Sequence, residues 1–359
     1  MSGFFYRQYK TFEGEILHLP GRLVAFIFFL ALLLLPLVSD DPFLLRVLIF
    51  ANIFSIFAVS WDFLSGFTGQ LNFGHALFFG IAAYTSALIN IHVHLPPWVT
   101  IPLGACAGVL GGLIVGIPAL RLRGHYLALV TLAFPMILAG IVMSFPDFLG
   151  GELGLSGIRG LSGARIHDYY ITLLVMIACV LIMWKLTDIS SEHVRTGVII
   201  RAIREDEITA RASGINTTAY KLLAFSISGL FAGIAGGLYT HFMKVVGPST
   251  LEVLFSFQAI IWTIFGGMGT IFGPVVGVFV LYAAMEMLHI SRGFQLLLLP
   301  VLVIAVLLFM PEGLGVWVLD KIEIKCPRCK LINYAMRRNC KVCGTPLRLS
   351  PEESSAKAG

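Results

Sequence analysis

Charged residues are scarce in this chain, and their scarcity excludes an ordinary soluble domain. Only 13% of the 359 residues are Asp, Glu, Lys or Arg, whereas 57% are hydrophobic. A soluble domain keeps roughly a quarter of its residues charged so that its surface can face water. The composition therefore predicts a protein whose surface faces lipid.

Several familiar motifs are also missing. No GxxxxGK[ST] loop, the usual cradle for nucleotide phosphates, occurs in the sequence. No HExxH spacing occurs either, which disfavours an intramembrane metalloenzyme built on His75, His125 and Asp62.

Residues 1–20 lack the apolar core and cleavage site of a signal peptide, so we expect the N-terminus to stay attached.

The apolar residues gather into runs that suit membrane helices, because about 20 helical residues cross a hydrocarbon layer of about 30 Å. The candidate spans are Leu23–Val38, Phe43–Leu64, Phe73–Val93, Trp98–Leu120, His125–Phe145, Tyr169–Leu186, Leu222–Met243, Val253–Phe265, Pro274–Leu288 and Phe294–Met310. The predicted fold is an all-α polytopic membrane protein of about ten helices. Glycines and a proline in Phe265–Pro274 predict a turn or broken helix inside protein. We expect the aromatic residues mainly on the lipid-facing surface and at its interfaces.

The basic residues of the loops predict the orientation, since cytoplasmic loops carry an excess of Lys and Arg. These residues are Arg7, Lys10, Arg22, Arg121, Arg123, Arg195, Arg201, Arg204, Arg211 and Lys221. With about ten spans they all fall on one side, and both termini fall there too. We therefore expect a multi-pass plasma membrane protein with cytoplasmic N- and C-termini.

The chain divides into consecutive parts. We predict a cytoplasmic N-terminal segment (1–21), a transmembrane domain (22–315) with a cytoplasmic loop inside it (188–220), a small Cys-rich domain (321–349) and a disordered tail (350–359). Net charge +5 comes from the loops and the tail, which would lie against anionic lipid headgroups. The aromatic residues do not indicate nucleic-acid stacking, so nucleic acid is not an expected partner.

The long polar loop Thr187–Lys221 mixes both charge signs. Apolar residues recur over Val198–Ala212 with the spacing of a short amphipathic helix, at Ile199, Ile203, Ile208 and Ala212. Gly214 would end this helix, and Asn216 or Thr217 would cap the next one. Periodicity alone fits a solvated connector and a docking element equally well.

Polar residues also interrupt the start of the third span. Between Ser65 and Tyr84 lie Gln70, Asn72 and His75, with Asp62 shortly before. One interpretation makes Asn72 a helix N-cap and the neighbouring glycines turn residues. The other places these four side chains along a permeation path, where a polar solute needs hydrogen-bonding groups. For the cluster as a whole we favour the path.

Four stretches resemble one family. "RAIREDEITARASGINTTAYKLLAFSISGLFAGIAGGLY" (201–239), "SGFTGQLNFGHALFFGIAAYTSA" (65–87), "ALRLRGHYLALVTLAF" (119–134) and "FGGMGTIFGPVVGVFVL" (265–281) are similar to LivM-like permeases. These are the membrane subunits of ATP-binding-cassette importers for branched-chain amino acids. The resemblance runs from about Arg22 to Gly313.

The resemblance implies an importer subunit that carries leucine, isoleucine and valine, although relatives carry urea or short-chain amides. Its implied partners are a second, LivH-like permease, two cytoplasmic ATPases and an extracytoplasmic solute-binding protein. ATP would act only through those partners. The positions that match the family's ATPase-coupling loop are Arg201, Arg204, Glu205, Asp206, Glu207, Ala210 and Gly214.

The Cys-rich tail departs from the family. Cys326, Cys329, Cys340 and Cys343 form two CxxC pairs, the spacing that clamps one tetrahedral ion. In a reducing cytoplasm metal binding explains paired cysteines better than disulfides do. The segment resembles a zinc ribbon, with iron as the alternative metal. Four thiolates leave no open position for catalysis, so a structural role is expected, and a membrane sensor with a zinc-ribbon output is a less favoured function.

Overall fold

The computed structural model describes residues 20–38, 41–120, 122, 125–188 and 195–287, together with 301, 304, 308, 313–315, 317, 321, 323–326, 332–334, 339–340 and 343–346. The chain forms two compact units, Ser39–Leu314 and a second one of Met1–Val38 with Gly315–Gly359. The predicted segments 1–21 and 350–359 fall almost entirely outside the described residues.

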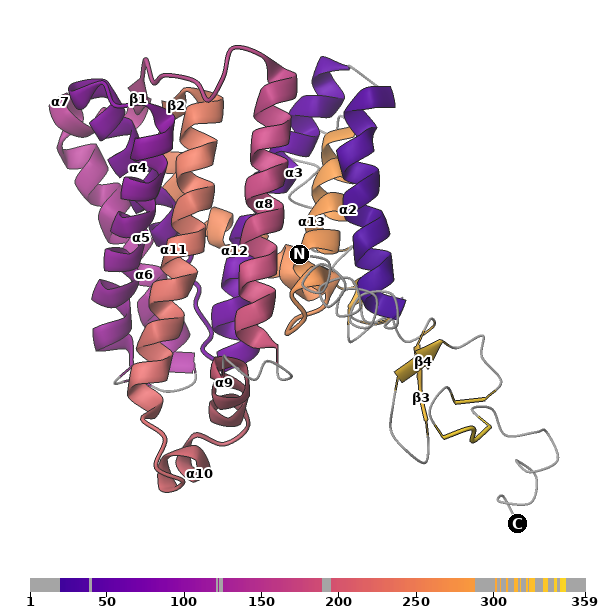
Figure 1. Ribbon diagram of the computed structural model, residues 1–359. Coiled ribbons are helices and arrows are strands. Elements are labelled where there is room, and N and C mark those ends of the chain that lie inside the picture. The colour runs from indigo at the N-terminus through magenta and orange to yellow at the C-terminus, as the bar shows by residue number, and fades with distance from the viewer. Residues whose placement is uncertain are drawn as a thin grey trace, which may run out of the picture. The chain divides into compact units, whose positions relative to one another are not determined.

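Helices dominate the larger unit (Figure 1). Six described helices are long and apolar enough to cross a membrane: α3 (Pro42–Trp61) with its π-helical extension η1 (Asp62–Gly66), α4 (Ala76–Val93), α5 (Pro97–Ala119), α6 (His125–Ser144), α8 (Arg165–Thr187) and α11 (Thr217–Met243). Shorter apolar helices are α12 (Val253–Gly266) and α13 (Phe272–Met287). The second unit contains α2 (Pro20–Val38), whose apolar part is the short stretch Val24–Leu37. The all-α polytopic fold is thereby confirmed.

Short elements join these helices. They are α7 (Pro146–Leu149), η2 (Gly151–Leu153), β1 (Leu155–Ser156), α9 (Thr196–Glu205), α10 (Glu207–Ala212), β2 (Val245–Val246) and η3 (Pro248–Leu251). β1 pairs antiparallel with β2. Figure 1 shows that pair at one end of the bundle and α9 with α10 at the other.

The helix ends follow local sequence chemistry. Pro42 opens α3, and the Asp41 carboxylate before it accepts a hydrogen bond of 3.0 Å from the Phe43 amide. The predicted cap of α11 is confirmed, because the Asn216 side chain accepts from the Ala219 amide at 3.1 Å. These caps supply partners for N–H groups that have none inside a helix.

Nine of the predicted spans fall on described residues, and each contains a helix. The boundary at Phe73 is wrong, because α4 begins only at Ala76 after a polar loop. The predicted turn between α12 and α13 is confirmed at residues 267–271. The tenth predicted span, Phe294–Met310, lies almost wholly outside the described residues.

The expectation for the aromatic residues needs a correction. A cluster of rings joins α3, α4, α12 and α13 inside the larger unit, with Phe54 at 5.1 Å from both Trp262 and Tyr282, and Phe255 at 4.8 Å from Phe79. Phe54 and Trp262 are both nearly inaccessible to solvent. Aromatic side chains that large pack interiors as readily as lipid-facing surfaces, so composition could not assign them to one place.

Glycines set the distance between α5 and α11. Gly108 on α5 and Gly229 on α11 lie against each other so closely that a Cβ on either would strike the other's backbone carbonyl oxygen. One turn further along, a Cβ on Gly112 would lie 2.6 Å from the Phe225 carbonyl oxygen. Small residues four apart allow such close backbone contact, which drives helix association in membranes.

We predict that Gly108→Ala destabilises the bundle by about 1–3 kcal/mol, the usual cost of forcing extra volume into a packed interior. The measurement is thermal unfolding of the purified protein. Gly140→Ala on α6 is the matched control, since a Cβ there meets nothing within 4 Å. Equal melting temperatures for the two variants would contradict the assigned helix contact.

Candidate functional site

The centre of the candidate site is a break between α3 and α4. α3 widens into η1, and after one further helical step the chain runs without helix from Gly69 to His75. Side chains satisfy this irregular backbone: the Trp61 indole donates to the Asn72 carbonyl at 2.7 Å, and the Ser65 hydroxyl donates to the Gln70 carbonyl at 2.9 Å. Without such partners, each buried backbone N–H or C=O group would lower the stability of the fold by about the free energy of one lost hydrogen bond.

His75 lies at the end of this loop and is fully buried. Its Nε2 is 2.9 Å from the Ser60 hydroxyl and 3.2 Å from the Phe57 carbonyl, while its Nδ1 is 3.5 Å from the Asn72 amide nitrogen. Ser228 of α11 donates to the Ser60 carbonyl at 2.8 Å. The imidazole therefore joins α3 to the loop, and a serine extends the network to α11.

The interpretation of Asn72 as the N-cap of α4 is wrong. Its Oδ1 accepts from the Gly74 amide at 2.9 Å inside the loop. The first amide of α4, that of Ala76, instead donates to the Ser256 hydroxyl of α12 at 2.9 Å. Another helix thus supplies the cap, because α4 starts later than the sequence predicts.

All four predicted path residues are buried, and two of them, Asn72 and His75, are in direct contact. Asp62, Asn72 and His75 are 0% exposed and Gln70 is 3% exposed. Two of their atoms have no hydrogen-bond partner among the described residues, the Asp62 Oδ2 and the Gln70 Oε1. Their role in contacting solute stays a prediction, with these two oxygens as the acceptors still free to serve it.

Asp62 connects the break to a second irregular segment. Its Oδ1 accepts a 2.7 Å hydrogen bond from the Gly269 amide in the turn between α12 and α13. Gly269 has φ 79°, a left-handed conformation that glycine adopts readily. The carboxylate therefore holds η1 and the α12–α13 turn together.

The polar loop contacts the helix α9. The Arg204 guanidinium donates to the Gly66 carbonyl at the end of η1. The Arg201 guanidinium lies 5.2 Å from the centre of the Phe67 ring, and burial lowers the pKa of Arg201. Arg204, Gly66, Asp62 and Gly269 thus make a continuous series of contacts from α9 to the α12–α13 turn.

The single amphipathic helix predicted over Val198–Ala212 is two helices. The break falls at Asp206, whose carboxylate accepts from the Ile208 amide at 2.8 Å and the Thr209 amide at 3.1 Å and so caps α10. A further hydrogen bond from the Thr209 hydroxyl, at 2.6 Å, is the main cause that lowers the pKa of Asp206. Asp is a strong helix N-cap, which is the physical reason for the break.

The predicted apolar face of this loop is partly correct. Ile203 is buried as expected, whereas Ile208 is 70% exposed and Ala212 is exposed too. Gly214 follows α10 with φ 83°, which confirms it as the stop. Exposed Ile208 leaves an apolar contact point on the outer surface of α10.

Glu207 is the predicted coupling residue that forms ion pairs with two cations. Its carboxylate accepts from Lys221 at 2.7 Å and from Arg211 at 3.0 Å. Arg211 lies on α10 itself, so the Lys221 ion pair is the one that joins α10 to the start of α11, whereas Glu205 is exposed. Motion of α10 would accordingly be passed to α11 directly.

The second unit contains the predicted metal site. β3 (Glu323–Lys325) pairs antiparallel with β4 (Ile332–Tyr334), and Cys326 follows β3 directly. The Sγ atoms of Cys326, Cys340 and Cys343 all lie within 4.8 Å of one another. Cys329 lies outside the described residues.

The geometry of these three thiols fits a metal ion. Zn–S bonds of about 2.3 Å in a tetrahedron place sulfur atoms about 3.8 Å apart, and Cys326 and Cys343 are separated by 3.4 Å. The Cys340 amide donates to the Thr345 carbonyl at 2.8 Å and the Gly344 amide donates back to Cys340 at 3.1 Å, which forms a tight turn around the site. A hydrogen bond with the Thr345 hydroxyl lowers the pKa of the Cys343 thiol and favours the thiolate that binds metals.

The intramembrane metalloenzyme gains no support. His75 uses both ring nitrogens within the loop network, and the His125 side chain lies outside the described residues. Among the described residues, the Cys cluster is the group suited to hold a metal.

The geometry is that of a helical membrane protein whose buried polar break is contacted by a short helix pair at one end, which fits a membrane transport subunit. The chain belongs to the family described as the permease component of branched-chain amino acid transport systems, which matches residues 43–310.

Individual relatives agree with this assignment. The chain is 28% identical to the high-affinity branched-chain amino acid permease LivM of Salmonella typhimurium, over 77% of this chain and 71% of that protein. It is likewise 28% identical to LivM of Escherichia coli, over 79% and 71%. It is 26% identical to the ribose import permease RbsC of Haemophilus influenzae, over 75% and 87%. The resemblance to LivM-like permeases is confirmed.

Sequence reasoning missed the residues that complete the break from other helices. Thr131 of α6 accepts from the Phe73 amide at 3.1 Å, and Ser256 of α12 accepts from the Ala76 amide at 2.9 Å. Ser228 of α11 instead donates to the Ser60 carbonyl of α3. Each is a hydroxyl within an apolar helix. Such a hydroxyl carries no local signal, because its partner is far away in the chain.

We predict that Asp62→Ala lowers stability by about 1–3 kcal/mol, since the partly buried Gly269 amide would lose its acceptor. Asp62→Asn keeps an acceptor oxygen and should cost clearly less. Thermal unfolding of both purified variants against the unaltered protein makes the comparison. Equal losses would show that the hydrogen bond to Gly269 is not what Asp62 contributes.

For the Cys cluster we predict about one metal ion per chain, measured by elemental analysis of protein purified without added metal. Cys340→Ser together with Cys343→Ser should abolish that ion. Cys106→Ser with Cys179→Ser is the control and should retain it, because these two cysteines lie on α5 and α8. Full metal content in the first variant would refute the site.

Proposed function

We propose that this chain is a permease subunit of an ATP-binding-cassette importer for the branched-chain amino acids leucine, isoleucine and valine, in the plasma (inner) membrane. The family match over residues 43–310 carries the proposal. The names of the LivM relatives support this substrate class. The ribose permease among the relatives is the reason to test substrate directly.

The proposed transport cycle uses the contacts of α9 and α10. Partner ATPases would bind the outer surface of α10, where Ile208 is 70% exposed, and would move the helix pair as they close on ATP. Arg204 would pass that movement to Gly66, and Asp62 to the α12–α13 turn. Glu207 would pass it to α11 through Lys221. Shifts of this kind expose a path to one side of the membrane and then the other.

The path itself would run past the break between α3 and α4. Irregular backbone at membrane depth is tolerated where it is buried in protein or lines a cavity. We propose that Gln70 and Asp62 offer their free oxygens to the solute in another state of the cycle. Asn72 and His75 would hold the loop in shape through that change.

The proposed assembly contains this chain, a second LivH-like permease, two cytoplasmic ATPases and an extracytoplasmic solute-binding protein. A LivH protein is among the relatives. The C-terminal unit would be a small cytoplasmic zinc ribbon, with iron as the alternative metal.

Importers of urea or short-chain amides are the second candidate function. A sensor with a zinc-ribbon output is a third, and transport that persists without residues 326–359 would exclude it.

We predict that Ile208→Asp lowers ATP-driven leucine uptake at least about tenfold in the reconstituted importer, because a charge at the centre of a docking surface cannot be paired. The same variant should lose its ATPase partners during co-purification.

Ile208→Leu is the control and should retain both properties. Since Ile208 is exposed, the melting temperature of the isolated chain should not change in either variant. Normal uptake by Ile208→Asp would contradict docking at α10. Absence of leucine uptake by the unaltered importer would contradict the substrate assignment.

A further inference from the structure

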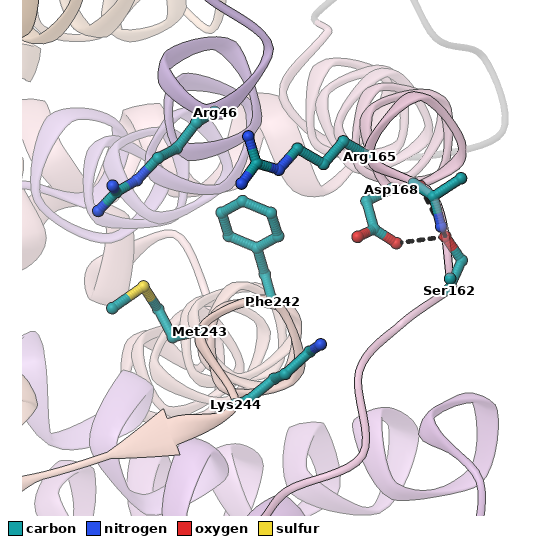
Figure 2. Close-up of a pocket in the computed structure, with 9 residues that line it drawn as sticks. Arg46, Ser162, Arg165, Asp168, Phe242, Met243 and Lys244 are labelled. Carbon is teal, nitrogen blue, oxygen red and sulfur yellow. Dashed lines mark hydrogen bonds between the residues drawn. The ribbon is translucent and has the colours of Figure 1, made fainter. Parts of the chain in front are cut away.

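A pocket of about 390 Å³ opens at the end of the bundle opposite α9 and α10. It lies where α3 and α8 begin and α11 ends, and it is lined by Arg46, Ser162, Arg165, Asp168, Phe242, Met243 and Lys244 with neighbouring backbone. In Figure 2, the Phe242 ring lies in the middle of the group, with Arg46 on one side and the Asp168 carboxylate on the other. The volume falls in the usual range for small-molecule sites, about 300–1,000 Å³.

The pocket has an excess of positive charge. Three of its side chains are cations, namely Arg46, Arg165 and Lys244, against the single carboxylate of Asp168. None of the three cations forms an ion pair with a described residue. Arg165 makes a single long hydrogen bond, 3.4 Å, to the Pro42 carbonyl, which leaves most of its donors available.

The pocket also has a fixed negative charge. Asp168 is 9% exposed, and its Oδ1 accepts a 2.6 Å hydrogen bond from the Ser162 hydroxyl. This bond holds the carboxylate in one orientation at the pocket wall. Phe242 and Met243 supply an apolar surface between the charges.

We propose that this pocket binds the zwitterionic head of a free amino acid on the outer side of the membrane. The arginines, Arg165 first, would bind the α-carboxylate, Asp168 would bind the α-ammonium, and Phe242 would contact the side chain. Arginine suits the first role because its planar fork matches a carboxylate.

A site of this kind matches the solutes of the proposed function, on which the inference rests. A zwitterion carries both charges that the pocket complements, whereas urea and short-chain amides carry none. The residues also lie at three helix ends, so a change in helix packing would separate Arg46, Arg165 and Lys244 and release the solute. Binding should be weak, because a transported solute must leave each site it enters.

The test uses the full-length chain in phosphatidylcholine nanodiscs and radiolabelled L-leucine as the probe. We expect saturable binding that Arg165→Gln and Asp168→Asn each weaken about tenfold or more, as expected for the loss of a charged hydrogen bond. Lys185→Gln removes the same charge at the other end of α8 and should leave binding unchanged. Melting curves should coincide, since Arg165 is exposed and Asn replaces Asp without a change of shape.

Competitors identify what the pocket recognises. Leucinamide lacks the carboxylate and 4-methylpentanoate lacks the ammonium, so each should compete at least about tenfold less well than leucine. Urea should not compete. If 4-methylpentanoate competes as well as leucine, the pocket is a plain anion site and the zwitterion proposal fails.

Other outcomes also overturn the proposal. Leucine binding that phosphatidylethanolamine in the nanodisc abolishes would make a lipid headgroup the occupant. Leucine binding that neither pocket variant weakens, or no saturable binding at all, would exclude the pocket. If the unaltered importer transports leucine while this binding fails, the importer function stands and the pocket proposal alone falls.

Discussion

The structure depends on one constraint: backbone that leaves the helix inside a membrane protein must find its hydrogen-bond partners in protein. Between Asp62 and Ala76 the chain leaves regular helix. Its partners come from its own polar side chains and from hydroxyls on α6 and α12. Because those helices hold the break in shape, the break cannot move without them, and a local irregularity becomes a point at which several helices are joined.

The same constraint explains why polar residues gather around the break. Hydrocarbon supplies no hydrogen bonds, so each unsatisfied group costs several kcal/mol. Gln70, Asn72 and His75 therefore serve the fold whether or not they also meet a solute. A structural role and a path role use the same hydrogen-bonding chemistry. The Asp62 Oδ2 and Gln70 Oε1 atoms differ from the rest, because no group in the described part of the fold uses them as acceptors. They are the atoms for which a path role does not compete with a structural one.

Sequence patterns predicted what depends on local chemistry. Apolar runs located the membrane helices, Asn216 and Gly214 marked helix ends, and the glycines of residues 265–274 marked a turn. The contacts that the sequence patterns missed join residues that lie far apart in the chain. Ser256 caps a helix that begins 180 residues earlier in the chain, and the Asp62–Gly269 bond joins residues 207 apart. The split at Asp206 is a different case, since its signal was local: an Asp is a strong N-cap, but the apolar periodicity runs through it.

Glycine determines which contacts in this molecule are rigid and which can shift. Along α5 and α11, a Cβ on Gly108, Gly112 or Gly229 would strike a backbone carbonyl of the facing helix, so these helices interlock at a fixed distance. At the break, Gly69 and Gly269 serve instead to permit left-handed backbone. The glycines of α5 and α11 therefore make a rigid helix pair, whereas Gly69 and Gly269 make turns that can change conformation at low cost in free energy. A force applied to α9 through Arg204 would therefore act on the adaptable turns first, while α5 and α11 move as one body.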